Sequence, residues 1–445
     1  MSIFKAYDIR GNFPEQINEE LVYNVGRALV SFLKCKNVLV ARDVRRSSPV
    51  LREALVKGIT DQGADVIDIG IASTDMFYYA VWKQKAEAGA MITASHNPKD
   101  DNGIKITREN AIPIGGGSGM EEIEKLSKEG EFQGVSEKGK VTEEGLLDDF
   151  VDFVLSFVDK DKIKPLKVVL NAYNGAGGII APKIFEKLKC RLVPMYFDAD
   201  GNFPGKAPNP LLGENREGII AKVKEEKADI GIAVDGDCDR AFFIDNEGNF
   251  ISGDFIFGLL SKNFLKKNPG AKILYDVRCS WYTKDVIEKN GGEAIKHRVG
   301  HAFFKNTMHK TGALLAGELS GHYYYRHKEL ATDNSWIPSL QILEMISEED
   351  KSLADLMEDA KDYHITGEIN FKVVDKDGLI KKIEEKYSDG KIEHIDGISV
   401  EYDGWRFNLR KSNTEPLVRL NLEGKTKEIM EAKKKEVISF IQDNS

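Results

Sequence analysis

Cysteine is scarce in this sequence of 445 residues, and no C-x-x-C pair occurs. This excludes a disulfide framework and a zinc ribbon, because both need clustered or regularly spaced thiols. Scattered thiols are typical of a reducing compartment, so we expect a cytoplasmic protein. The cysteines are Cys35, Cys190, Cys238 and Cys279.

Long apolar runs and an excess of positive charge are also missing. No stretch approaches the ~18 residues of a membrane-spanning helix, and the N-terminal MSIFKAYDIRG lacks the apolar region of a signal peptide. Lysine and arginine number 63 against 72 aspartates and glutamates, a net charge of −9. We therefore expect neither a membrane nor a nucleic acid as partner, whereas a small anionic substrate stays compatible because local charge decides its binding.

The sequence does contain a repeated order of elements. A strand-like run at 37–43 is followed by a helical pattern at 49–63 and a second strand-like run at 64–70. The same order returns within 167–197 and within 272–299. Apolar runs that alternate with amphipathic segments predict βαβ units with largely parallel sheets.

Each repeat continues into a further apolar strand that ends in a polar loop. The loops are TASHNPKDDNG (93–103), DGDCDR (235–240) and GELSGH (317–322). Ligands of open α/β sheets gather at the C-terminal ends of strands. The pattern predicts three related mixed α/β domains around one central cleft.

The C-terminal segment has a different pattern. Strand-like runs precede the amphipathic stretch KEIMEAKKKEVISFIQ, which predicts a small α+β domain with a mostly antiparallel sheet. The charged stretch 358–368 is expected to be a hinge linker. We predict domains at 1–142, 143–249, 250–360 and 361–445.

The first loop places Ser95 directly after a buried strand, with His96 and Lys105 close in sequence. Such a serine can act as a nucleophile or carry a phosphoryl group. The G-x-S-x-G pattern of acyl-transfer enzymes is absent, so that chemistry is disfavoured. A turn serine that caps a helix remains the alternative for this loop taken alone.

The second loop places Asp235, Asp237 and Asp239 at alternate positions. Alternate residues of an extended segment share one face, and carboxylates so close repel one another unless a cation lies among them. Oxygen ligands favour Mg²⁺. An EF-hand is disfavoured, because its required glycine and glutamate positions hold Arg240 and Asn246. A solvated acidic turn is the simpler alternative.

The remaining polar loops are weaker signals. GELSGH combines a carboxylate, a hydroxyl and an imidazole, which can bind adjacent sugar hydroxyls or simply form a polar turn. RKSNTEPLVR (410–419) combines arginines, hydroxyls and turn amides, which make an anion pocket or an exposed edge turn. The glycine-rich turn at 175–178 imitates a dinucleotide fingerprint, but Ile180 stands where that pattern needs Gly or Ala.

Taken together and in order, these loops resemble the α-D-phosphohexomutase family, in particular its phosphomannomutase/phosphoglucomutase branch. The resemblance extends from FKAYDIRG (4–11) to SNTEP (412–416) and so covers essentially the whole chain. It implies three α/β domains and a fourth, TATA-binding-protein-like domain around a large cleft. It also implies that Ser95 carries a phosphoryl group and, with Asp235, Asp237 and Asp239, holds Mg²⁺.

The resemblance implies further site roles. The residues expected around the transferring phosphoryl group, with Lys105 a candidate for proton transfer, are Tyr7, Arg10, His96, Lys105, Arg240, His301 and His322. The residues expected to bind sugar hydroxyls, or to lie beside them, are Glu318, Ser320, His322 and Arg298. The residues expected to hold the second, non-reacting phosphate are Arg410, Ser412, Asn413, Thr414 and Arg419.

Two loops place the sequence in the mannose/glucose branch. Phosphoglucosamine mutases typically read GEQSGH, whereas Leu319 replaces that glutamine here, and SNTEP resembles the mannose/glucose type. Three positions depart from the usual pattern: Arg298 replaces a commoner lysine, Cys238 a commoner small residue, and Asn334-Ser335 a commoner Gly-Ile. The last of these leaves the choice between sugars open.

The expected reaction interconverts hexose 1-phosphate and hexose 6-phosphate through a phosphoserine and a hexose 1,6-bisphosphate intermediate. The alternatives are a phosphoglucosamine mutase, a Mg²⁺-dependent sugar phosphatase and a non-catalytic sugar-phosphate-binding protein. The enclosed cleft favours a mutase, and the presence of Ser95, the aspartates and Lys105 disfavours mere binding. We expect sugar phosphates as the partners of a monomer or homodimer.

Overall fold

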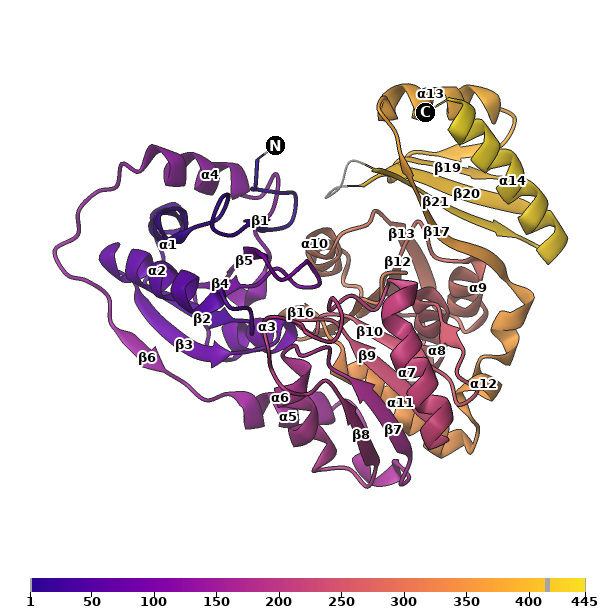
Figure 1. The fold of residues 1–445 in the computed structure, drawn as a ribbon, viewed down its shortest axis with the longest axis horizontal. Coiled ribbons are helices and arrows are strands. Elements are labelled where there is room, and N and C mark those ends of the chain that lie inside the picture. Colours follow the sequence, from indigo (N-terminus) through magenta and orange to yellow (C-terminus); the bar gives the residue numbers. More distant parts are fainter. Residues whose placement is uncertain (1, 413–416, 445) are drawn as a thin grey trace.

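The structure, a computed structural model, describes residues 2–412 and 417–444. Within these residues the strands form four sheets, one per domain, in chain order. The first three domains form one body, and the fourth lies at one edge of it (Figure 1). Among the described helices, none is long and apolar enough to cross a membrane.

The first sheet has the order β1-β5-β4-β2-β3-β6, with its parallel part centred on β2 and an antiparallel pair β4–β5. The elements of this domain are β1 (Ile9–Asn12), α1 (Glu19–Leu33), β2 (Asn37–Arg42), α2 (Ser48–Asp61), β3 (Asp65–Ile71), α3 (Thr74–Lys83), β4 (Ala88–Ile92), β5 (Asp101–Arg108), α4 (Met120–Glu129) and β6 (Val141–Glu143).

The second and third sheets repeat this plan, with the orders β11-β10-β9-β7-β8 and β13-β12-β14-β15-β16. The second domain contains α5 (Leu147–Leu155), β7 (Lys167–Asn171), α6 (Gly177–Phe185), β8 (Arg191–Met195), α7 (Gly213–Glu226), β9 (Ile230–Val234), β10 (Ala241–Ile244) and β11 (Phe250–Ile251). The third contains α8 (Gly253–Lys267), β12 (Lys272–Asp276), α9 (Trp281–Lys289), β13 (Glu293–His297), α10 (His301–Thr311), β14 (Leu315–Gly317), β15 (Tyr323–His327), β16 (Leu330–Asp333), α11 (Trp336–Glu349) and α12 (Leu353–Leu356).

The predicted repeat is confirmed. In each of these domains a parallel β-α-β unit is followed by a fully buried strand, β4, β9 or β14, which then pairs with an antiparallel strand. The loop after that buried strand carries each polar motif. Because the topology is the same three times, the three motifs leave their sheets at equivalent places.

The fourth sheet, β17-β21-β20-β19-β18, is antiparallel throughout. Its elements are β17 (His364–Lys372), α13 (Lys376–Lys386), β18 (Lys391–Glu393), β19 (Ile398–Glu401), β20 (Trp405–Lys411), β21 (Leu417–Gly424) and α14 (Lys427–Asp443). The sequence patterns predicted β17, β19, β20, β21 and α14, but neither β18 nor α13.

The hinge linker expected at 358–368 is shorter than predicted. A short 3-10 helix (Glu358–Asp362) occupies its first half, and β17 begins at His364. Burial of Ala360 and pairing of β17 with β21 order this charged stretch, because tertiary contacts override its polar composition.

The apolar cores divide the molecule into two parts. One continuous core runs through the first three domains and includes Phe77, Val168, Ile273 and Trp336. The core of the fourth domain contains residues between 373 and 441 only. Burial of apolar surface therefore joins the first three domains, whereas the fourth domain has a separate core and meets the third through hydrogen bonds and ion pairs such as Ser280–Glu423 and Lys296–Glu393.

Candidate active site

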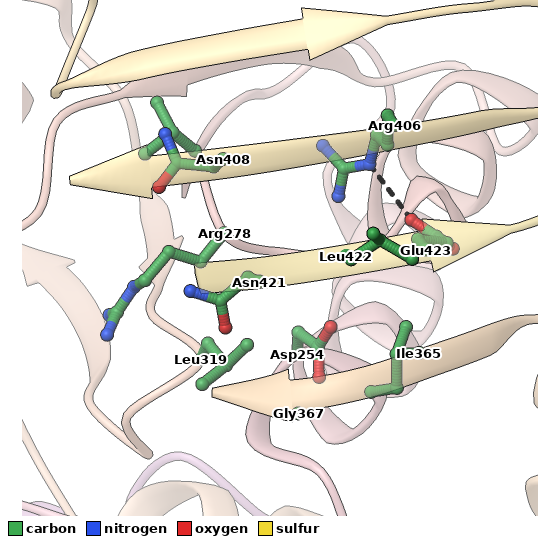
Figure 2. Close-up of a pocket in the computed structure, with 11 residues that line it drawn as sticks. Asp254, Arg278, Leu319, Ile365, Gly367, Arg406, Asn408, Asn421, Leu422 and Glu423 are labelled. Carbon is green, nitrogen blue, oxygen red and sulfur yellow. Dashed lines mark hydrogen bonds and ion pairs between the residues drawn. The ribbon is translucent and has the colours of Figure 1, made fainter. Parts of the chain in front are cut away.

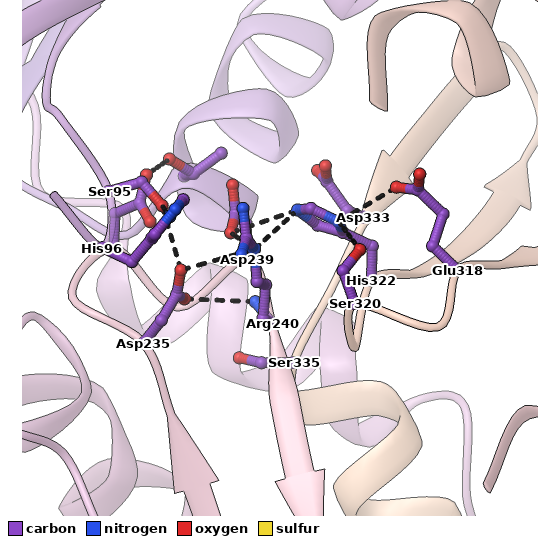
Figure 3. A network of polar contacts seen from close by, with 12 residues as sticks. Ser95, His96, Asp235, Asp239, Arg240, Glu318, Ser320, His322, Asp333 and Ser335 are labelled. Carbon is purple, nitrogen blue, oxygen red and sulfur yellow. Dashed lines mark hydrogen bonds and ion pairs between the residues drawn. The ribbon is translucent and has the colours of Figure 1, made fainter. Parts of the chain in front are cut away.

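The three motif loops meet at one large cavity of about 1380 Å³, which the fourth domain also lines. Figure 3 shows the loops of Ser95, of Asp235 to Arg240 and of Glu318 to His322 converging from three domains. The sequence-predicted residues that line the cavity are Tyr7, Arg10, His96, Arg240, His301, Glu318, Ser320, His322, Arg410, Ser412 and Arg419.

Ser95 is buried beside the aspartate loop and is not among the cavity-lining residues, although its neighbour His96 is. Its hydroxyl donates to Asp235 Oδ2 at 3.0 Å, and its Oγ lies 3.1 Å from His96 Nδ1. The backbone of Ser95 has a φ of +50°, in the left-handed region that costs a non-glycine residue energy. The structure thus brings together Ser95 and the second loop, although 140 residues separate Ser95 from Asp235.

His96 is held neutral. Burial, together with the nearby Arg240 and Arg10, pushes the pKa of the imidazole well below its ordinary value. A neutral imidazole next to a serine hydroxyl can accept a proton or a hydrogen bond.

The aspartates form a buried acidic cluster that could hold a metal ion. One carboxylate oxygen from each of Asp235, Asp237 and Asp239 lies within 4.8 Å of the others. Burial, then the charges of Asp239 and Asp237, raise the pKa of Asp235 well above its ordinary value. In the described part of the chain Asp237 Oδ1 and Asp239 Oδ1 accept no hydrogen bond, and only Asp239 Oδ1 has cationic neighbours, His322 Nε2 at 3.5 Å and Arg240 Nε at 3.7 Å. Both oxygens therefore have capacity left to ligate a cation. All-oxygen donors of this kind suit a hard divalent ion.

Lys105 partly neutralises the cluster. Its Nζ lies 2.5 Å from Asp239 Oδ2 and 3.3 Å from Asp237 Oδ2, and the lysine is buried. Burial lowers the pKa of this ammonium, but the two carboxylates outweigh burial and raise the pKa well above its ordinary value. Thr74, at the start of α3, completes the surroundings by donating to Asp237 Oδ2 at 2.6 Å.

His322 connects the second and third loops. Its Nδ1 lies 3.0 Å from Glu318 Oε2 and its Nε2 3.5 Å from Asp239 Oδ1. Burial and Arg240, whose Nε is 3.2 Å from His322 Nε2, lower the pKa of the imidazole, but Asp239 and Glu318 outweigh them and raise it to about 9. Glu318 also accepts from Gly300 N and Tyr324 OH, so its position is fixed.

The N-terminal segment reaches the third domain. Tyr7 OH donates to Val299 O at 3.2 Å, and its ring centroid lies 5.5 Å from that of His301. Arg10 donates to Asn97 Oδ1 at 2.8 Å, next to the serine loop. Both side chains thereby face the same cavity from the first domain.

The fourth domain contributes cations to the cavity. Arg419 Nη1 lies 2.9 Å and Arg410 Nη2 3.6 Å from the carboxylate of Glu368. Ser412 lines the cavity, whereas Asn413 and Thr414 lie outside the described residues. Arg298 is placed differently from the others: it is exposed, stacks 3.9 Å above the Phe303 ring and is not among the cavity-lining residues.

Arg278 and Glu368 are among the cavity residues that sequence reasoning missed. Arg278, at the C-terminal end of β12, forms an ion pair with Asp276 at 2.7 Å and reaches Glu368 of β17 at 3.4 Å. Its position just after a parallel strand was a usable signal, because ligands gather at such strand ends. Glu368 gave no comparable signal, since its role depends on contacts with three distant arginines.

A second, smaller cavity of about 20 Å³ lies where the fourth sheet meets the third domain. Figure 2 shows Asn408 and Asn421 on neighbouring strands above Asp254, with Arg406 and Glu423 paired beside them. Arg406 Nε donates to Glu423 Oε2 at 2.9 Å. This junction ties the polar face of the fourth sheet to the third domain.

Comparisons with known proteins agree with this architecture. Family models described as phosphoglucomutase/phosphomannomutase alpha/beta/alpha domains I, II and III match residues 1–134, 148–248 and 252–363. The model of the C-terminal domain of the same family matches residues 368–439.

Relatives and a solved structure cover nearly the whole chain. A phosphomannomutase of Vibrio cholerae is 43% identical over 439 residues, 96% of this chain and 95% of that protein. A phosphomannomutase of Escherichia coli K12 is 40% identical over 454 residues, 100% of this chain and 99% of that protein. A phosphoglucomutase/phosphomannomutase family protein from Burkholderia thailandensis has a similar structure, with a TM-score of 0.89, 32% identity and coverage of 99% of this chain and 95% of that one. On these matches the chain belongs to the phosphoglucomutase/phosphomannomutase family of enzymes.

Proposed function

We propose that this protein is a phosphohexomutase that interconverts hexose 1-phosphates and hexose 6-phosphates, with mannose or glucose as the sugar. The observation that carries the proposal is the hydroxyl of Ser95, 3.0 Å from the first aspartate of a buried acidic cluster and next to His96, which lines a cavity large enough for a sugar bisphosphate. Membership of the family and relatives named phosphomannomutase support the same reaction.

The proposed reaction moves one phosphoryl group at a time. A free sugar hydroxyl attacks the phosphorus carried on Ser95, so a bond from phosphorus to the sugar oxygen forms and the bond to Ser95 Oγ breaks. The hydroxyl gives its proton to a neighbouring base, and the serine oxygen takes one from a neighbouring acid. The hexose 1,6-bisphosphate then turns in the cavity and returns its other phosphoryl group to Ser95 by the reverse step.

The chain's own residues position and neutralise the reacting groups. Lys105 is cationic in this setting and is the proposed proton donor to the departing serine oxygen, while neutral His96 is the proposed acceptor. Arg240 and Arg10 supply positive charge to the transferring group. The aspartates and Ser95 would hold Mg²⁺, which supplies further charge neutralisation at the phosphoryl oxygens.

Ligand recognition is assigned to the third and fourth domains. Glu318, Ser320 and His322 would bind sugar hydroxyls, and Arg298 would approach the sugar only by leaving its stack on Phe303. The cations proposed for the non-reacting phosphate, with Ser412, Asn413 and Thr414 beside them, are Arg278, Arg410 and Arg419. The same residues can bind the hexose 1,6-bisphosphate in both orientations, because either phosphate can lie at Ser95 while the other lies at the arginines.

The decisive experiment replaces the serine. Ser95→Ala and the exposed control Ser156→Ala are assayed side by side with mannose, glucose and glucosamine 1-phosphates, Mg²⁺ and trace hexose bisphosphate. We expect Ser95→Ala to lose isomerisation and the control to keep it. Near-normal turnover of Ser95→Ala would contradict the proposal, and steady release of inorganic phosphate by the wild type would indicate a phosphatase. Preference for glucosamine 1-phosphate would assign the protein to a different branch.

A further inference from the structure

One arginine is buried directly behind the serine loop. Arg45 is 1% exposed, and its two terminal nitrogens donate to four backbone carbonyls of that loop. Nη2 donates to Ser95 O at 2.8 Å and to Asn97 O at 2.7 Å. Nη1 donates to Pro98 O at 2.5 Å and to Asp101 O at 3.0 Å. A single guanidinium therefore fixes the loop from the serine to the start of β5.

The guanidinium is itself held rigidly. Arg45 Nε lies 3.2 Å from Asp43 Oδ2, and Asp43 Oδ1 accepts from Arg45 N at 2.9 Å and from Ser48 Oγ at 2.5 Å. The guanidinium carbon lies 5.1 Å from the centroid of the Phe203 ring in the second domain. Arg45 thus links the serine loop both to the first sheet and to the second domain.

The serine loop needs such support because it carries a backbone conformation that is unfavourable for serine. Ser95 has a φ of +50°, and a residue in this region persists only where its surroundings enforce it. Gly236 of the aspartate loop approaches the same carbonyl closely: a Cβ at position 236 would lie 2.8 Å from Ser95 O. The carbonyl of Ser95 is consequently in close contact with both Arg45 and the aspartate loop.

We propose that Arg45 is a positioning residue for phosphoryl transfer, which holds the backbone of Ser95 so that its hydroxyl faces the aspartates. This inference rests on the proposed function. Transfer between an enzyme serine and a sugar hydroxyl depends on in-line placement of the reacting atoms, and a displacement of about 1 Å can cost about 10²-fold in rate. Among the described residues, the hydrogen bonds and the ion pair of Arg45 stay within the first domain and do not reach the sugar-binding loop 317–322, so its loss should leave substrate affinity nearly intact.

The test measures phosphoserine formation directly. Wild type, Arg45→Ala, Arg45→Lys and the exposed neighbour control Arg46→Ala are mixed with labelled glucose 1,6-bisphosphate and Mg²⁺, and label on residue 95 is followed in a single turnover. Circular dichroism and thermal unfolding identify the folded fraction to which each rate is normalised.

We expect Arg45→Ala to be labelled about 10²-fold more slowly than wild type, with a KM for hexose 1-phosphate within a few-fold. Added guanidinium ion should speed labelling of Arg45→Ala, because it can occupy the vacated space and donate to the same carbonyls. Arg45→Lys should remain slow, since an ammonium cannot span four carbonyls as the planar fork does. Arg46→Ala should match the wild type.

Several results would overturn the inference. Labelling of folded Arg45→Ala at the wild-type rate, or failure of guanidinium to speed a slow Arg45→Ala, would show that Arg45 has no positioning role. If Arg45→Ala does not fold, Arg45→Lys decides: labelling at the wild-type rate overturns the inference, and slow labelling of the folded protein with KM unchanged supports it. A wild type that takes up no label at residue 95 would instead contradict the proposed function itself.

Discussion

At the scale of single residues, three carboxylates buried at one point need a compensating charge. Lys105 supplies one positive charge to Asp237 and Asp239. Burial and the charges of Asp239 and Asp237 raise the pKa of Asp235. A divalent ion would remove the remaining repulsion. We therefore predict that removing one of these carboxylates impairs metal binding more than it reduces local stability.

Asp237→Asn tests this residue-scale prediction. The amide keeps the shape of the side chain but removes the charge of one proposed ligand, so we expect kcat to fall roughly 10²–10³-fold and the Mg²⁺ concentration for half-maximal activity to rise. Steady-state kinetics over a Mg²⁺ titration measures both. The exposed Asp350→Asn serves as the matched control, and an unchanged Mg²⁺ dependence in Asp237→Asn would refute the assignment.

His322 provides a pH-dependent prediction at the same scale. Its pKa is raised to about 9 by Asp239 and Glu318 against the effects of burial and Arg240. The pKa of His322 in the folded protein lies above the ordinary value near 6.5, so the protonated imidazole stabilises the folded state. This contribution to the free energy of unfolding is fully present below about pH 6.5 and is lost as the pH rises through about 9. The test is an NMR pH titration of the metal-free protein labelled with ¹³C-histidine, in which the signal missing from His322→Gln is assigned to His322. We expect that signal to titrate near pH 9.

Mg²⁺ should shift this titration to lower pH, because a cation at Asp239 offsets the attraction that favours the imidazolium. The Arg240 guanidinium opposes protonation in both states. Titration near the ordinary value without metal, or no shift on adding Mg²⁺, would contradict this account of His322.

At the scale of elements, strand alternation decides which face of the fourth sheet meets the active site. Trp405, Phe407 and Leu409 of β20 enter the core under α13 and α14. The alternate residues Arg406, Asn408 and Arg410 lie on the opposite face, which meets the third domain and the cavity. Neighbouring β21 follows the same period of two, so one sheet presents an apolar face to its helices and a charged face to the ligand.

Glu423→Ala tests how this face is attached. Glu423 is buried and accepts from Arg406, from Ser280 Oγ and from Trp281 N at the start of α9. Its removal leaves Arg406 without its carboxylate partner, so we expect destabilisation of the domain junction by about 3 kcal/mol. Hydrogen exchange should increase in β20, β21 and the first turn of α9, whereas the exposed control Glu385→Ala should leave exchange unchanged. Unaltered exchange in Glu423→Ala would show that the junction does not depend on this carboxylate.

At the scale of the whole molecule, the cavity is larger than its proposed ligand requires. Its volume of about 1380 Å³ exceeds the roughly 300–1,000 Å³ of typical small-molecule sites. The fourth domain has its own apolar core, and β17, which carries Gly367 at a φ of +68°, leads into it. A separately folded domain on a polar junction can move toward the ligand and exclude water.

This architecture predicts domain closure on ligand binding. Small-angle X-ray scattering of Ser95→Ala, which cannot turn over, should show a smaller radius of gyration with glucose 1,6-bisphosphate than without it. Unphosphorylated glucose is the control, because it offers no anion to Arg410 and Arg419 of the fourth domain. An identical radius of gyration with and without the bisphosphate would argue that the domain does not close.

The amino-acid sequence alone predicts the repeated β-α-β order, the polar loops after the buried strands and the antiparallel C-terminal sheet. It could do so because these features follow from local hydrophobic periodicity and turn residues. Local patterns missed α13, which has few apolar residues, and part of the linker at 358–368, where burial of Ala360 and pairing of β17 decide the outcome.

Which distant groups share one site follows from the packing of the domains and cannot be read from any local segment of the chain. Three contacts illustrate this, because each joins separate domains or loops. They are the contact of Ser95 with Asp235, the hydrogen bonds of Arg45 to four carbonyls, and the ion pair of Arg278 with Glu368. Such contacts depend on how three sheets pack on a common core, and no local pattern records them. The residue types that give each loop its chemistry can thus be recognised in the sequence. The placement of the loops beside one another arises from burial of the apolar surface that joins the domains.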